Sequence, residues 1–326
     1  MDIRIALKTG IARLREADVP SLTLDAELLL LHVLGRNRTW LYAHPEEILS
    51  DTEAKRFLNL IARRAAGEPT QHLTGKQEFW GLEFEVTPDV LIPRPETEHL
   101  IEVALDRLAV RELRANRPPK SDGAGLDIAD IGTGSGCIAI ALAKELPGAN
   151  FLATDISPAA LAVAKRNATR HAVADRIEFS EASLLSPVGA QHVTPQPVKI
   201  QNNAPPASHQ SRITGPDSRL FDLIASNPPY IGRRESPTLS REVRDHEPHA
   251  ALFGGEEGYE LYADLITESA RHLKPGGILV IELGHNSLPA VQPLLDTTAW
   301  TNIGVTNDLA GVPRVLAAGR LRLVNF

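Results

Sequence analysis

The stretch LDIADIGTGSG, residues 126–136, decides the fold of this chain. Its apolar first half predicts a buried strand, and its glycine-rich second half predicts a tight turn whose backbone a ligand can approach closely. The apolar run that follows predicts a helix through Leu146. The turn is not a phosphate-binding loop, because no Gly-Lys-Ser/Thr follows it, and glycines at every second position do not fit the dinucleotide spacing.

The alternation of strand and helix continues on the carboxyl-terminal side of this unit. It predicts a mostly parallel, doubly wound α/β sheet with helices on both faces, in which ligands bind at the carboxyl ends of the strands. The predicted strands are 126–131, 151–154, 177–180, 220–226, 278–283, 301–305 and 314–317, and the helices between them include 157–171 and 259–273.

An acidic residue, Asp155, follows the second predicted strand, 19 residues after Gly136. An Asp at this position is placed to accept hydrogen bonds from both hydroxyls of a ribose. A nucleoside without a pyrophosphate fits the loop, and S-adenosylmethionine is the common cofactor of that kind. Asp130 either holds the amino-acid part of this ligand through water or complements the helix dipole. A glycine-rich turn without any ligand is the alternative.

A second motif, Asn227-Pro228-Pro229-Tyr230, directly follows the fourth predicted strand. Its two prolines prevent helical geometry and predict a stiff turn at the strand end. The motif suits a planar group that bears an NH2, because the Asn oxygen and a proline-locked carbonyl each accept one N–H while the Tyr ring stacks on the group. Taken alone, the tetrapeptide also fits an ordinary proline-rich turn.

The two motifs together predict an N-methyltransferase. Methyl transfer is an in-line displacement, so the protein mainly aligns the nucleophile, the methyl group and the sulfur. Two acceptors that grip the hydrogens of an amide or exocyclic amine favour a pyramidal, nucleophilic nitrogen and stabilise the positive charge that develops on it. The motif requires no titratable base.

Residues 1–75 predict helices and no strand. A C-cap at Gly35 and a capping box at Ser50-Asp51-Thr52-Glu53 support a small helical bundle. From the pattern alone, this bundle either recognises the substrate or is a structural cap.

Residues 76–93 predict a β-hairpin linker, because apolar residues from Trp80 onward alternate with polar ones. Residues 94–326 then form the predicted methyltransferase domain. Pro95 suits the first turn of its first helix, which we expect to end before a loop at 111–125. The residues Arg94, Thr97 and Glu98 either line a site or serve only the helix start.

The composition limits the class of protein. With 326 residues, 43% hydrophobic and 23% charged, the chain is predicted to be an ordinary globular protein without a membrane span or signal peptide. A single cysteine, Cys137, excludes an intramolecular disulfide and a multi-cysteine zinc site, and favours a cytoplasmic location. The net charge of −7 argues against a general nucleic-acid binder. The 11 histidines form no metal-ligand pattern, so no metal is expected.

One segment breaks the strand–helix pattern. Residues 187–219 are rich in Pro, Gln, Asn and Ser and contain no aromatic residue, which predicts a disordered insertion. It is interpreted as an inert tether, with contact to a partner as the alternative.

With these residues the chain resembles the release-factor glutamine methyltransferases of the PrmC/HemK family, and the likeness covers nearly the whole chain. The Arg-Pro-Glu-Thr-Glu and Leu-Phe-Gly-Gly segments are more specific than Asn-Pro-Pro-Tyr. The matching segments are Gln77–Gly81, Leu91–Glu98, Asp130–Gly136, Asn227–Ile231, Glu247–Gly255 and Glu282–Gly284.

The resemblance implies a class I S-adenosylmethionine-dependent methyltransferase domain behind an N-terminal helical domain that helps to dock the substrate. The implied reaction is methylation of the side-chain amide nitrogen, N5, of the glutamine in the Gly-Gly-Gln loop of class-1 peptide chain release factors. Asn227, Pro228 and Tyr230 are the implied catalytic residues, and Pro229 joins them in holding the substrate amide. The implied cofactor contacts are Gly132, Thr133, Gly134, Ser135, Gly136, Asp155, Ser183 and Asn227.

The sequence departs from the family in two places. After the third strand the family often has an Asp and a large apolar residue against the adenine, whereas the corresponding pair here is Ala182-Ser183. The insertion at 187–219 is the second departure.

Four other functions compete with this interpretation. A nucleic-acid amine methyltransferase uses the same kind of tip, but the acidic charge and the lack of a basic segment with interleaved aromatics oppose it. A ribosomal-protein glutamine methyltransferase shares the chemistry, although the Arg-Pro-Glu-Thr-Glu segment favours release factors. A cofactor-binding module without catalysis would not need an intact Asn-Pro-Pro-Tyr. A nicotinamide oxidoreductase does not fit the glycine spacing.

Overall fold

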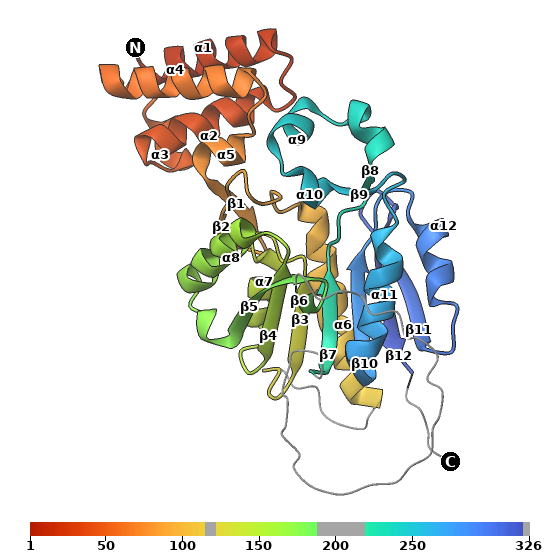
Figure 1. Cartoon of the computed structure of the whole chain (residues 1–326). Helices are drawn as coiled ribbons and strands as arrows, with labels where there is room; N and C mark the ends of the chain where they lie inside the picture. Colours follow the sequence, from red (N-terminus) through yellow and green to blue (C-terminus); the bar gives the residue numbers. More distant parts are fainter. Residues whose placement is uncertain (115–121, 188–218, 322–326) are drawn as a thin grey trace, which may run out of the picture.

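The computed structural model describes residues 1–114, 122–187 and 219–321 (Figure 1). A helical part lies at one end of the molecule and a large α/β part forms the rest. The predicted insertion at 187–219 lies outside the described residues except at its two ends. Among the helices of the described ranges, none is long and apolar enough to span a bilayer.

The amino-terminal part is helical, as the sequence predicts, with a single isolated β-bridge between Asp2 and Ile48. Helix α2 ends at Gly35, whose φ of +61° closes it, and the Ser50–Glu53 capping box starts α4. Apolar side chains such as Phe57 and Leu29 are fully buried between the helices. The helices are α1 Ile3–Glu16, α2 Leu22–Leu34, α3 Arg38–Ala43, α4 Asp51–Ala65 and α5 Thr70–Thr74.

A short antiparallel hairpin of β1 (Lys76–Phe79) and β2 (Leu82–Glu85) connects the two parts. The alternation predicted a strand or a hairpin without locating a turn, and Trp80 and Gly81 form the turn of the hairpin, with φ values of +54° and +67°. Two consecutive positive φ angles match the twist of a two-residue hairpin, and the carboxylate of Glu98 accepts the Trp80 N–H at 2.7 Å. A distant side chain therefore stabilises a backbone conformation that the alternation does not show.

The α/β part has an eight-stranded sheet in the order β11-β12-β10-β7-β3-β4-β5-β6. The strands β5, β4, β3, β7 and β10 are parallel, and β12 and β11 add antiparallel to the β10 edge. The predicted mostly parallel, doubly wound sheet is confirmed. The strands are β3 Asp127–Ile131, β4 Asn150–Asp155, β5 Ile177–Ser183, β6 Ser186–Pro187, β7 Phe221–Ser226, β10 Leu273–Glu282, β11 Trp300–Asn307 and β12 Pro313–Arg320.

Helices cover both faces of this sheet (Figure 1). Successive residues of a central strand point to opposite faces, so Ile128 packs in the core beneath α6 and α7, and Ala129 packs in the core beneath α11. The helices are α6 Glu98–Arg114, α7 Cys137–Glu145, α8 Pro158–Arg170, α11 Leu261–His272 and α12 Leu288–Val291, with single 3-10 turns at Pro95–Thr97, Ala174–Arg176 and Gln292–Leu295.

Helix α6 is longer than predicted, because residues 111–114 were expected in a loop. The Arg111 guanidinium donates to Asp222 Oδ1 at 2.9 Å and to the Asp222 carbonyl oxygen at 3.2 Å. This contact with β7 extends the helix, and a partner 111 positions away leaves no local signal.

The segment between β7 and α11 folds beside the helical part. It contains β8 Ile231–Gly232, a 3-10 helix at Arg233–Thr238, α9 Arg241–His246, α10 His249–Leu252 and β9 Phe253–Gly255. The buried Arg64 of α4 bonds to Asp25 at 2.7 Å and to Glu242 of α9 at 2.8 Å. This ion-pair group joins the helical part to the segment that follows the Asn-Pro-Pro-Tyr motif.

Candidate functional site

The glycine-rich loop lies between the carboxyl end of β3 and the start of α7. Gly132 and Gly134 have φ values of +71° and +54°, and a Cβ atom at either would meet nothing within 4 Å. The Thr133 N–H donates to the Thr154 carbonyl oxygen at 2.8 Å, which fixes the loop to β4. The loop therefore presents its backbone to open space, as a ligand cradle does.

Asp155 is fixed against this loop from the end of β4. Its Oδ2 accepts from Gly134 N and its Oδ1 from Ser157 N, both at 2.9 Å. Each carboxylate oxygen keeps a lone pair that can accept a further hydrogen bond. The structure thus brings Asp155 to the predicted loop with capacity left for two hydroxyl donors.

Asp130 lies beneath the loop and is completely buried. Its Oδ2 accepts from Thr133 Oγ1 at 2.6 Å and from Ala139 N at 3.1 Å. Its Oδ1 has no hydrogen-bond partner within the described ranges. Burial raises the pKa of Asp130 to about 7. An unpaired buried carboxylate oxygen suits a ligand group that carries N–H donors or positive charge.

The far side of the predicted cofactor site is formed by the end of β5. Ser183 is exposed there, whereas Ala182 is buried and faces the sheet. The next residue, Leu184, is half-buried against the core, and its carbonyl oxygen accepts from Thr154 Oγ1 at 2.7 Å. The sequence analysis did not single out Leu184, the apolar side chain that follows this strand.

The Asn-Pro-Pro-Tyr motif lies beside the glycine loop because β7 and β3 are neighbours. Ser226 and Ile131, the last residues of these strands, are directly paired, and Ser226 Oγ donates to the Ile131 carbonyl oxygen at 2.8 Å. Asn227 and Gly132 therefore leave adjacent strands at the same edge of the sheet. This adjacency brings together the two motifs that lie about a hundred positions apart in the sequence.

Asn227 and Tyr230 are both anchored by side chains from other segments. Asn227 Nδ2 donates to Thr97 Oγ1 at 3.1 Å, and Thr97 Oγ1 donates to Glu282 Oε2 at 2.6 Å. Tyr230 Oη donates to Glu282 Oε1 at 3.1 Å, and burial raises the pKa of this phenol. From the sequence, Thr97 was one of three residues that either line a site or serve only the helix start, and Glu282 was not predicted as a site residue. The one sequence signal for both residues is that they lie in segments that match the family.

The other two helix-start residues are directed elsewhere. Arg94 pairs with the buried Glu247, whose second oxygen accepts from Ile92 N at 3.2 Å. Glu98 accepts from Trp80 N in the hairpin turn. Only Thr97 of the three contacts the substrate motif.

The backbone of the motif is enclosed by β9 and the residues after it. A Cβ atom at Gly254 would lie 2.3 Å from the Pro229 carbonyl oxygen, and one at Gly258 would lie 2.4 Å from the Tyr230 carbonyl oxygen. The segment that follows the motif returns and packs directly on it, which explains why small residues stand at these positions.

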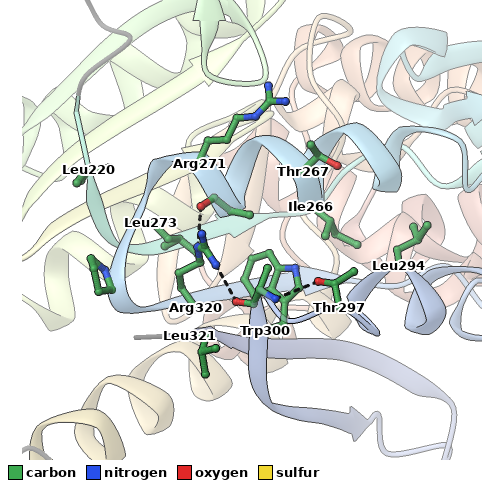
Figure 2. Close-up of a pocket in the computed structure, with 13 residues that line it drawn as sticks. Leu220, Ile266, Thr267, Arg271, Leu273, Leu294, Thr297, Trp300, Arg320 and Leu321 are labelled. Carbon is green, nitrogen blue, oxygen red and sulfur yellow. Dashed lines mark hydrogen bonds between the residues drawn. The ribbon is translucent and has the colours of Figure 1, made fainter. Parts of the chain in front are cut away.

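A separate pocket lies at the opposite, amino-terminal end of the strands (Figure 2). It is lined by Leu220, which precedes β7, and by Leu273, the first residue of β10. One of its two guanidinium groups, that of Arg320, already donates to the carbonyl oxygens of Ala270 and Ala299 at 2.8 and 3.0 Å. This pocket is not the site of the chemistry, because it is remote from both motifs.

A doubly wound sheet with a nucleoside-type glycine loop on one strand and Asn-Pro-Pro-Tyr on the next defines a class I S-adenosylmethionine-dependent methyltransferase. Residues 6–75 match the family model of the PrmC N-terminal domain, and residues 109–197 match the methyltransferase small domain.

Comparison with curated relatives identifies the family within this class of methyltransferases. The chain is 42% identical to the release factor glutamine methyltransferase of Koribacter versatilis over 97% of this chain and 98% of that one. It is 39% identical to the enzyme of the same name from Bradyrhizobium diazoefficiens, over 98% and 95%. The chain belongs to the release factor glutamine methyltransferase family. A more distant likeness is the solved hMettl16 catalytic domain in complex with the MAT2A 3′UTR hairpin 6, at 19% identity and a TM-score of 0.49, over 85% of this chain and 84% of that one.

Proposed function

We propose that this protein transfers a methyl group from S-adenosylmethionine to N5 of the glutamine side chain in the Gly-Gly-Gln motif of class-1 peptide chain release factors. The single observation that carries the proposal is the direct pairing of Ser226 with Ile131, because the Asn-Pro-Pro-Tyr turn and the glycine-rich loop then follow neighbouring strands at the same edge of the sheet. Membership of the family supports the choice of substrate.

The residues of the loop fit the cofactor. The open cradle at Gly132 and Gly134 takes the nucleoside part, and Asp155 accepts the ribose hydroxyls. The unpaired oxygen of Asp130 would accept from the amino group of the cofactor, and Ser183 and Leu184 would hold its base. When bound, S-adenosylmethionine supplies an electrophilic methyl group.

The Asn-Pro-Pro-Tyr residues hold the acceptor amide. Asn227 Oδ1 and a carbonyl oxygen of the proline pair accept its two N–H groups, and the ring of Tyr230 packs on its face. When its two N–H groups are held in this way, the amide nitrogen becomes pyramidal and its lone pair no longer takes part in amide resonance. The lone pair is then directed toward the methyl group. The anchored ends of the motif make this grip rigid before substrate arrives.

The amino-terminal helices and the α9–α10 segment serve to dock the protein substrate. The ion pairs of the buried Arg64 with Asp25 and with the half-buried Glu242 hold these two surfaces in a fixed relation. A release factor acts in translation, so the same proposal assigns the enzyme to the cytoplasm.

The test is methyl transfer from labelled S-adenosylmethionine. A class-1 release factor, its Gln→Ala Gly-Gly-Gln variant, total RNA and a ribosomal-protein fraction are offered in parallel. We expect label on the intact release factor only. Label on the Gln→Ala variant, on RNA or on a ribosomal protein instead would overturn the assignment of the acceptor.

A further inference from the structure

Four side chains from three separate segments form one hydrogen-bonded chain behind the substrate tip. It runs from Asn227 through Thr97 to Glu282, and from Glu282 to Tyr230. Thr97 is 2% exposed and Glu282 is fully buried. Both ends of the chain therefore belong to the substrate motif, and its centre is a buried carboxyl group.

When Glu282 is ionised, the chemistry of the groups fixes the direction of each hydrogen bond. An ionised carboxylate only accepts, so Thr97 gives its one hydroxyl hydrogen to Glu282 and can then only accept. The separation of 2.6 Å is that of a charge-assisted O–H···O⁻ bond. A Thr97 hydroxyl that already donates to Glu282 can only accept from Asn227, so it bonds to the Asn227 NH2 group. The carboxamide oxygen Oδ1 of Asn227 is then left without a partner from Thr97 and is available to the substrate.

We propose that Glu282 is a positioning residue that, through Thr97, presents the carboxamide oxygen of Asn227 rather than its NH2 group to the substrate amide. The inference rests on the proposed function, because an amide NH2 needs acceptors. A carboxamide turned by 180° would set N–H groups against N–H groups and abolish the grip.

Protonation of Glu282 removes the constraint. A neutral carboxyl donates to Thr97, whose own hydrogen can then go to the oxygen of Asn227. The charged and titratable groups that face Glu282 are Arg314 of β12, Glu96 of the turn before α6, Tyr230 of the motif, Tyr262 of α11 and Cys137 of α7.

Burial is the largest of these influences and raises the pKa of Glu282, while the Thr97 bond and Arg314 lower it. The ionised form of Glu282 is the one that holds the Asn227 carboxamide in the orientation needed for methyl transfer. Transfer is therefore lost as pH falls through this raised pKa, at a higher pH than for an ordinary carboxyl group.

The first test compares two substitutions at Thr97. Thr97→Val keeps the shape and removes the hydroxyl, and Thr97→Ser keeps the hydroxyl and removes a methyl. We expect kcat on a release factor to fall by roughly 10- to 100-fold for Thr97→Val and by less than about 3-fold for Thr97→Ser, with the KM for S-adenosylmethionine nearly constant in both.

If Thr97 had a purely structural role, kcat would fall more in Thr97→Ser than in Thr97→Val, because Val preserves the packing and Ser does not. Ser269→Ala is the matched control, because Ser269 is a buried residue of α11 whose hydroxyl has no hydrogen-bond partner among the described residues. Thermal melting of all three variants shows whether they are folded. Wild-type kcat in Thr97→Val, or equal losses in Val and Ser, would disprove the inference.

The second test uses the pH dependence of kcat at saturating cofactor. The wild type should show an acid limb, and Glu282→Gln, whose side chain keeps an acceptor but does not titrate, should lose that limb. An unchanged limb in Glu282→Gln would also disprove the inference. A wild-type enzyme that methylates no release factor would instead overturn the proposed function, so the two failures are distinguishable.

Discussion

The glycine-rich loop at residues 132–136 (the loop) and the Asn227–Tyr230 turn (the tip) follow adjacent strands, yet they are stabilised in different ways. The loop is held by contacts close in sequence: Asp130 bonds to residues 3 and 9 positions away, and Asp155 to Gly134, 21 positions away. The tip is held by distant side chains: Thr97 is 130 positions from Asn227, and Glu282 is 185 positions from Thr97.

The difference shows how the two halves of the site can fail separately. The loop folds with its own strand–turn–helix unit, so we expect cofactor affinity to depend on a short part of the chain. The geometry of the tip needs the 3-10 turn before α6, β10 and β9 to be in place, so we expect turnover to be sensitive to substitutions remote in sequence. The following experiments test this separation.

The largest effect is expected at the tip itself. Asn227→Ala removes the amide acceptor and should lower kcat by at least about 10³-fold, while the Kd for S-adenosylmethionine changes by only a few-fold. Single-turnover transfer and calorimetric cofactor binding measure the two quantities. Turnover near that of the wild type would refute the amide-grip mechanism.

The enclosing segment should affect turnover without touching the substrate. In Gly254→Ala the new Cβ would lie 2.3 Å from the Pro229 carbonyl oxygen, so the tip must shift. We expect kcat to fall by roughly 10- to 100-fold with cofactor affinity preserved. Gly319→Ala, where a Cβ meets no atom nearer than 3.3 Å, is the matched control. Equal kcat in the two variants would mean that the tip does not need this support.

A change in pH should alter the affinity of the loop for the cofactor. The pKa of Asp130 is raised to about 7 by burial, and its charged form suits the cationic amino-acid part of the cofactor. Below this pKa the proton must be displaced, so the Kd should rise by up to about tenfold per pH unit as pH falls. Calorimetry between pH 6 and 8 tests this, and Asp130→Asn should flatten the slope. A flat wild-type profile would exclude a role for Asp130 in cofactor binding.

The smallest effect is expected from residues that belong to neither region. Deletion of residues 189–217, which lie outside the described structure, should leave methyl transfer within a few-fold of wild type. A large loss in the same assay, with the melting temperature unchanged, would assign the insertion a functional role.

The sequence was a good guide wherever the signal is local. The five central strands and the mostly parallel sheet follow from short apolar runs separated by helix patterns, and the capping box at Ser50 and the C-cap at Gly35 appear as predicted. The errors lie where distant contacts decide. Helix α6 continues to Arg114, past its predicted end, because Arg111 reaches β7, and no local pattern located the hairpin turn at Trp80, whose N–H donates to Glu98.

The sequence by itself determined which motifs follow which strands: a glycine-rich loop, an Asp at the end of the next strand, and an Asn-Pro-Pro-Tyr turn. These signals are local because backbone geometry and side-chain chemistry act within a few residues. Only the tertiary structure decided that Thr97 and Glu282 anchor Asn227 and Tyr230. Their hydrogen bonds join segments brought together by strand order, and no periodicity or spacing along the chain encodes such a contact.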